Sequence, residues 1–110
     1  MESNFVPVAR KAEIPPGKMK MVKFLDRELL IANVDGNYYA IGNKCTHANG
    51  DLSQGILEGN VVTCPKHNSK FDVTTGKVVA PPKIGFFHPK IREEPSYSVK
   101  VEDESILIKV

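Results

Sequence analysis

The sequence predicts an all-β protein, built as an antiparallel sandwich or barrel. Short runs of apolar and β-branched residues recur along the 110-residue chain, as is typical of strands. Turn-forming residues separate these runs every few positions, which favours a sandwich or barrel. No stretch keeps a helical periodicity beyond about a turn or two. Functional residues are then expected on loops held by this β scaffold.

Four hairpins are predicted, because turn residues separate four pairs of apolar runs. In the fourth pair apolar and polar residues alternate, which predicts a hairpin with one buried face. The pairs are 20–25 and 29–34 around Asp26-Arg27, 29–34 and 38–41 around Asp35-Gly36-Asn37, 56–57 and 61–62 around Glu58-Gly59-Asn60, and 97–101 and 106–110 around Glu102-Asp103-Glu104.

Length and charge narrow the classes of protein that this chain can be. The length is typical of one domain, expected to span residues 1–110. The net charge is only +2, and the 15 lysines and arginines are scattered, so no nucleic-acid partner is expected. No apolar stretch approaches the length of a membrane span, and Met1-Glu2-Ser3-Asn4 does not resemble the start of a secretory signal. The expectation is a cytoplasmic protein, with a monomer as the simplest oligomeric state.

Two loops carry the residues with metal chemistry. The polar, turn-rich region 43–55 contains Cys45-Thr46-His47, and a second loop contains Cys64-Pro65-Lys66-His67. Two of the three histidines therefore lie beside the only two cysteines, with sixteen residues between His47 and Cys64. Chance placement is a poor explanation of this pattern. Two thiolates and two imidazoles suit a soft or borderline metal.

Two kinds of metal centre are compatible with these ligands. A structural Cys₂His₂ zinc site is chemically sound, although its usual order is a Cys pair followed by a His pair. A [2Fe–2S] cluster with two Cys on one iron and two His on the other is the alternative. In that cluster each loop gives one ligand to each iron, which one Cys and one His per loop allows. Spacing alone leaves both centres open.

Residues 45–52 and 64–72, with Thr75-Gly76 and Pro81-Pro82, closely resemble Rieske-type ferredoxins, such as the ferredoxin components of ring-hydroxylating oxygenase systems. The resemblance runs from about residue 33 to residue 82. It implies a sandwich or barrel base with an inserted cluster-binding subdomain at about residues 43–82, and prolines that cover the cluster.

The resemblance also implies a role for each ligand. Cys45 and Cys64 would hold the inner iron of one [2Fe–2S] cluster per chain, and His47 and His67 the outer iron. The chain would be a one-electron carrier rather than an enzyme, passing electrons from a reductase to a terminal acceptor such as an oxygenase. The alternative within the family is a small subunit of a larger oxidoreductase, similar to that of some nitrite reductases.

Oxygenase activity in the chain itself is not expected. It would need a second iron site with two histidines and a carboxylate, and only His88 remains after the cluster takes its two. We assign His88 no metal role. The nearby Phe86-Phe87 could either help a partner to dock or pack into the core.

Several positions depart from the family pattern. Asn49 and Asn68 stand where glycine is usual, which predicts a positive φ at both, because asparagine tolerates left-handed backbone best among non-glycine residues. High-potential relatives carry a disulfide where this chain has Gly50 and Lys66, and a tyrosine hydroxyl where it has Phe71, although Ser69 keeps its hydroxyl. Fewer hydrogen bonds to sulfur predict a reduction potential in the lower half of the Rieske range, roughly −150 to +50 mV.

Overall fold

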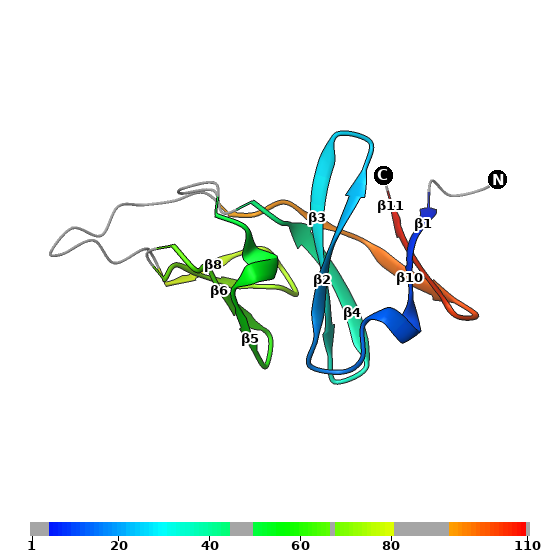
Figure 1. Ribbon diagram of the computed structural model, residues 1–110, viewed down its shortest axis with the longest axis horizontal. Coiled ribbons are helices and arrows are strands. Elements are labelled where there is room, and N and C mark those ends of the chain that lie inside the picture. The colour runs from blue at the N-terminus through cyan, green and yellow to red at the C-terminus, as the bar shows by residue number, and fades with distance from the viewer. Residues whose placement is uncertain (1–4, 45–49, 67, 81–92, 110) are drawn as a thin grey trace, which may run out of the picture.

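The computed structural model describes residues 5–44, 50–66, 68–80 and 93–109, which form eleven strands and two single 3₁₀ turns (Figure 1). These residues confirm the all-β class. No helix among them is long and apolar enough to cross a membrane. The elements are β1 (Phe5–Arg10), η1 (Lys11–Glu13), β2 (Met19–Phe24), β3 (Arg27–Val34), β4 (Asn37–Gly42), η2 (Leu52–Gln54), β5 (Ile56–Glu58), β6 (Val61–Thr63), β7 (Lys70–Asp72), β8 (Val78–Ala80), β9 (Ser96–Tyr97), β10 (Val99–Glu102) and β11 (Ser105–Lys109).

The strands form three antiparallel sheets. Their strand orders are β1-β11-β10, β2-β3-β4-β9 and β5-β6-β7-β8. In Figure 1 the second sheet lies between the other two, with the third at the opposite end from both termini. We call the first two sheets the base and the third the inserted sheet. The inserted sheet lies between β4 and β9 in the sequence, so the chain leaves the base once and returns to it once.

Strand β3 forms a wall between two hydrophobic cores, because its side chains alternate between the two faces of the middle sheet. Leu29 and Ile31 point into the core of the base, whereas Leu30 and Ala32 point toward the inserted sheet. All four are buried, so neither face of the strand is polar over residues 29–32. The base core also contains Ile14, Val22, Ala40, Ile106 and Ile108, and the other core contains Ile41, Leu52, Val62, Cys64, Phe71 and Val73.

The predicted hairpins form, and three of the four turns lie where turn residues predict them. Asp35 and Gly36 both have positive φ, of 55° and 92°, as a tight hairpin turn requires. The first turn differs from the prediction: it is made by Leu25 and Asp26, and Arg27 already belongs to β3. Leu25 has a φ of 59° and is 83% exposed. An exposed leucine in a left-handed conformation gives no sequence signal for a turn.

The predicted strand over 97–101 is in fact two strands with different partners. Tyr97 in β9 pairs with Ala40 of β4, whereas β10 pairs with β11. The prediction of one buried face is also wrong for β11, in which Ile106, Leu107 and Ile108 are all buried. Leu107 is flanked by Pro7 on β1 and Lys100 on β10, because β11 is the central strand of its sheet.

Candidate metal centre

Of the four predicted ligands, the structure describes Cys64. Cys45, His47 and His67 lie outside the described residues, as do Asn49, Pro81-Pro82, Phe86-Phe87 and His88. The site is therefore built from Cys64, from the two ends of the first loop at Lys44 and Gly50, and from the residues around them.

Cys64 follows β6 directly and is completely buried. Its backbone N–H donates to the carbonyl of Ser69, 2.8 Å away, which closes the second loop between β6 and β7. Its sulfur accepts a hydrogen bond from the backbone N–H of Lys66 at 3.4 Å. A backbone donor aimed at sulfur favours the charged thiolate over the neutral thiol. A buried sulfur with such a donor fits a metal-bound thiolate.

Asn68 has a φ of 58°, which confirms the prediction of a left-handed backbone at this position. The same prediction for Asn49 lies outside the described residues. Ser69 and Phe71, which follow in the chain, are both completely buried. Phe71 packs in the same core as Cys64, so the position that has lost its hydroxyl contributes apolar packing beside the sulfur.

Gly50 brings the end of the first loop against the second. A Cβ added at Gly50 would lie 2.7 Å from the Cys64 sulfur, closer than atoms can pack. The same point lies 3.5 Å from Cγ of Lys66. Gly50 and Lys66 are therefore neighbours, both close to the Cys64 sulfur, and neither carries sulfur of its own. The missing side chain at Gly50 is what lets the two loops approach so closely.

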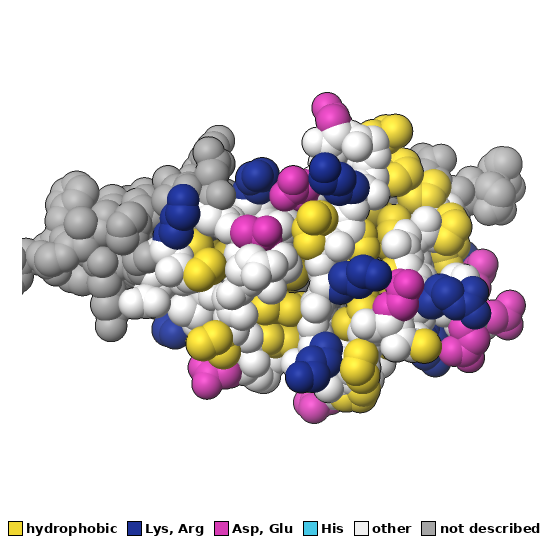
Figure 2. Space-filling model, in the orientation of Figure 1, with side chains coloured by type: hydrophobic (Ala, Val, Ile, Leu, Met, Phe, Trp, Pro, Cys, Tyr) yellow, Lys and Arg dark blue, Asp and Glu magenta, His cyan; other side chains and the backbone are white. Residues whose placement is uncertain are grey.

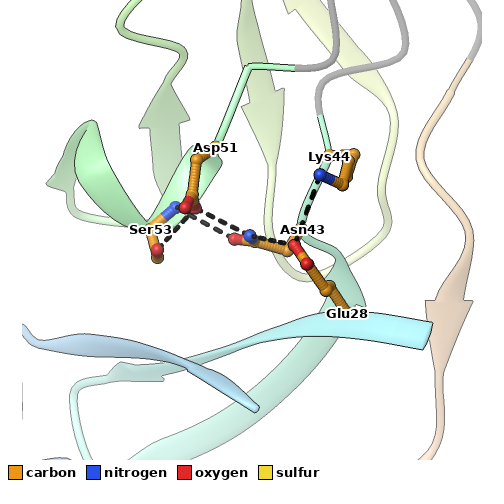
Figure 3. Close-up of polar contacts among 5 residues, drawn as sticks. All are labelled: Glu28, Asn43, Lys44, Asp51 and Ser53. Atoms are coloured by element: carbon orange, nitrogen blue, oxygen red, sulfur yellow. Dashed lines mark hydrogen bonds and ion pairs between the residues drawn. The ribbon is translucent and has the colours of Figure 1, made fainter. Parts of the chain in front are cut away.

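A hydrogen-bonded clasp ties together the two ends of the first loop (Figure 3). The buried Asn43 amide donates from Nδ2 to Oδ1 of Asp51 at 2.7 Å, and its Oδ1 accepts from the backbone N–H of Ser53 at 3.0 Å. The Ser53 hydroxyl donates to the same Asp51 oxygen at 2.6 Å. Lys44 and Asp51 form an isolated β-bridge. We call Asn43, Asp51 and Ser53 the clasp.

The clasp is polar but well satisfied, which is what a buried amide requires. The hydrogen bond from Ser53 is the largest influence on Asp51, and together with Asn43 it holds the pKa of that carboxyl below its usual value. Asp51 also caps η2 by accepting from the Ser53 backbone N–H. Sequence reasoning missed this role. The signal was present as an Asp two residues before a Ser, a common capping pattern.

The Thr75-Gly76 motif also has a structural role. A Cβ at Gly76 would overlap the carbonyl oxygen of Glu94, and the backbone N–H of Glu94 donates to the Gly76 carbonyl at 2.8 Å. The Gly76 φ of 83° is left-handed. Glycine at this position therefore allows the chain returning toward β9 to pack against the inserted sheet.

Comparison with known proteins gives the family. The model of the Rieske [2Fe–2S] domain matches residues 4–108. The ferredoxin component of the naphthalene 1,2-dioxygenase/salicylate 5-hydroxylase systems of a Ralstonia species is 34% identical, covering 100% of this chain and 99% of that protein. The biphenyl dioxygenase ferredoxin subunit of Pseudomonas sp. (strain KKS102) is 37% identical, covering 96% of this chain and 91% of that protein.

A solved structure of the complex of reduced oxygenase and oxidized ferredoxin in carbazole 1,9a-dioxygenase contains a chain of the same fold. That chain is 26% identical, with a TM-score of 0.80, over 98% of this chain and 94% of its own length. Because the family model and the relatives both match almost from end to end, this chain belongs to the Rieske [2Fe–2S] domain family, as an electron-carrying ferredoxin whose cofactor is a Rieske-type [2Fe–2S] cluster.

Proposed function

We propose that Cys45 and Cys64 bind one iron of the cluster and that His47 and His67 bind the other. The observation that carries this assignment is the contact between Gly50 and the Cys64 sulfur. It brings the end of the loop that contains Cys45 and His47 against the loop that contains Cys64 and His67. One Cys and one His from each loop can then reach two adjacent irons.

The cluster, when bound, supplies a one-electron redox couple. The described residues prepare the site for it in three ways. The Lys66 backbone N–H donates a hydrogen bond to the Cys64 sulfur. The clasp fixes both ends of the first loop, and the apolar core around Phe71 excludes water from the sulfur. The histidines must be neutral to bind, because a protonated ring nitrogen has no lone pair to donate.

We also propose the partners and the cell compartment. The chain passes electrons from a reductase to the oxygenase of a ring-hydroxylating system, as the names of the relatives suggest. Relatives of similar identity belong to naphthalene and biphenyl systems, so the aromatic substrate is recognised by the oxygenase rather than by this chain. The protein acts in the cytoplasm, since two cysteines kept as thiolates suit a reducing compartment, and it acts as a monomer.

The proposal extends to the domain organisation of the chain. Residues 1–110 form one Rieske domain, with the cluster-binding subdomain at about residues 43–82. In support, all four strands of the inserted sheet lie within this range. The structural zinc alternative fails, because the family that this chain belongs to binds a [2Fe–2S] cluster. The oxidoreductase-subunit alternative is less well supported, because the relatives are named as ferredoxin components.

Four single variants and one matched control test the ligand set. We expect Cys45→Ser, Cys64→Ser, His47→Ala and His67→Ala each to lose the visible absorption and the electron paramagnetic resonance signal of the reduced cluster. His88→Ala, which removes the third histidine, should keep both. A cluster retained in full by any of the four variants, or lost in His88→Ala, would contradict the assignment.

A second experiment tests the electron-carrier role. The reduced protein should be reoxidised by a ring-hydroxylating oxygenase of the naphthalene or biphenyl class, and the rate should rise in proportion to oxygenase concentration. Reduced protein that is stable in the presence of each such oxygenase would contradict this choice of partner.

A further inference from the structure

The side chain of Lys66 lies across the point where the two loops meet. Its Cγ and Cδ lie 3.5 and 3.6 Å from the position that a Cβ at Gly50 would take, which is ordinary van der Waals range. The Cys64 sulfur lies 2.7 Å from the same position. The aliphatic stem of Lys66, the backbone of Gly50 and the sulfur of Cys64 therefore converge on one small volume.

These three residues differ in their exposure to solvent. Gly50 and Cys64 are buried, whereas Lys66 is exposed as a whole. A lysine can cover apolar surface with its methylene groups while its ammonium stays in water. In the described part of the chain, Lys66 makes no salt bridge with a carboxylate. Its positive charge is therefore not neutralised by a described neighbour.

We propose that Lys66 is a positioning residue with two separable effects on the cluster: its stem closes the contact between the two loops, and its ammonium raises the reduction potential. The proposal rests on the proposed function, because it requires Cys64 to be a ligand. Packing of the stem on Gly50 keeps water and chelators from the Cys64 sulfur. The ammonium favours the reduced state, because reduction adds one negative charge nearby.

Three variants of the cluster-loaded protein separate the two effects. Lys66→Met keeps an unbranched apolar stem and removes the charge. Lys66→Ala removes both the stem and the charge. Lys109→Met is the matched control: it makes the same change in net charge at an exposed position on β11, in the base. All three keep the backbone N–H that donates to the Cys64 sulfur.

The electrostatic effect is measured as the midpoint potential by protein voltammetry. We expect Lys66→Met to disfavour reduction about threefold, which at about 59 mV per tenfold change for one electron is about 28 mV. Because the ammonium is exposed, the shift should be present at about 0.01 M salt and lost at about 1 M, where the Debye length falls from about 30 to 3 Å. A shift no larger than that of Lys109→Met would overturn this part.

The packing effect is measured as the rate at which visible absorption is lost in the presence of an iron chelator. We expect Lys66→Ala to lose its cluster about tenfold faster than wild type, and Lys66→Met to stay within about twofold of wild type. Equal rates in Lys66→Ala and Lys66→Met would overturn the packing effect. A failure of the ligand assignment is distinguishable, because it would appear in the Cys64→Ser variant, whatever the Lys66 variants do.

Discussion

The base and the inserted sheet both consist of antiparallel strands, but the longest strands of the molecule are in the base. In the base, strands β1 to β4 have six or eight residues each. In the inserted sheet, all four strands have three. Isolated short strands are marginally stable in water. The inserted sheet therefore depends on packing against β3, on the clasp and, with the proposed ligands, on the cluster itself.

The two hydrophobic cores also differ, in the residues that they contain. The fully buried residues of the base core are all aliphatic, whereas the core beneath the inserted sheet includes the sulfur of Cys64. A defect in the core of the base should lower the stability of the whole fold. A defect in the core beneath the inserted sheet should also weaken cluster binding. Adjacent residues on one strand can test this difference, because β3 faces both cores.

The largest effect is expected for Leu29→Ala and Leu30→Ala. Both side chains are buried, so each truncation should lower the free energy of unfolding by about 2–5 kcal/mol. Urea unfolding followed by circular dichroism measures this loss. Only Leu30→Ala should speed the loss of visible absorption below the unfolding transition, because Leu30 faces the Cys64 core. Equal acceleration in both variants would show that the two cores act as one.

Gly50→Ala should have the next largest effect. Its new Cβ would lie 2.7 Å from the Cys64 sulfur, and overpacking of this kind costs about 1–3 kcal/mol. The cluster should be bound weakly, with a changed midpoint potential. The control is Gly59→Ala in the β5–β6 turn, where no atom lies within 4 Å of the new Cβ. That variant should lose stability only through its left-handed backbone and keep the wild-type potential.

Asp51→Asn should have a smaller effect, about 0.5–2 kcal/mol, because it weakens the cap on η2 and the contact with Asn43. The folded-state pKa of Asp51 is lowered, so its contribution is fully present above the usual Asp value of about 3.9 and is lost as the pH falls through the folded value. The stability difference from wild type should therefore be constant between about pH 7 and pH 5. A difference that shrinks within that interval would contradict the clasp.

The smallest effect is expected for surface ion pairs, in either region. Lys44 lies 3.7 Å from Glu28 beside the first loop, and Lys20 lies 3.4 Å from Glu13 on the base. Both lysines are exposed, so Lys44→Met and Lys20→Met should each change stability by about 1 kcal/mol or less, and less still at high salt. A clearly larger loss in Lys44→Met alone would add Lys44 to the residues that hold the first loop.

Local turn chemistry could be predicted from the sequence, but the pairing of distant strands could not. Asp35-Gly36 and Gly59-Asn60 indicate their turns because few other residues accept a positive φ. Strands β1, β7 and β8 were not predicted, and the split between β9 and β10 was missed. In the sequence, β9 and β10 together form a single run of alternating apolar and polar residues. Their separation is decided by tertiary contacts, since β9 pairs with β4 and β10 pairs with β11.

The candidate site divides in a similar way. The left-handed Asn68 could be predicted because asparagine is the non-glycine residue that best accepts this conformation, whereas the ligand set stays a prediction. The supporting residues could not be predicted. Asn43 resembles any polar residue after a strand, and its buried amide is satisfied by Asp51 and Ser53, which lie eight and ten residues further along the chain. Figure 2 shows basic and acidic side chains interspersed over the described part of the visible face, so no large patch of one sign of charge marks that face.

The two-sided burial of β3 has a consequence for alignment along the strands. When one face of a strand is polar, a one-residue slip is penalised at every position. In β3 a one-residue slip would place Ile31 where Leu30 now lies. Apolar residues would still occupy both faces of the strand, so burial alone penalises the slip weakly. The left-handed residues at Leu25, Asp35 and Gly36 therefore help to fix the alignment, as does the buried Asn33, which donates to the carbonyl of Ile14. A slip at the Asp35-Gly36 turn would move Asn43 by about 3.3 Å, so a turn at the far end of β4 sets where the first loop begins.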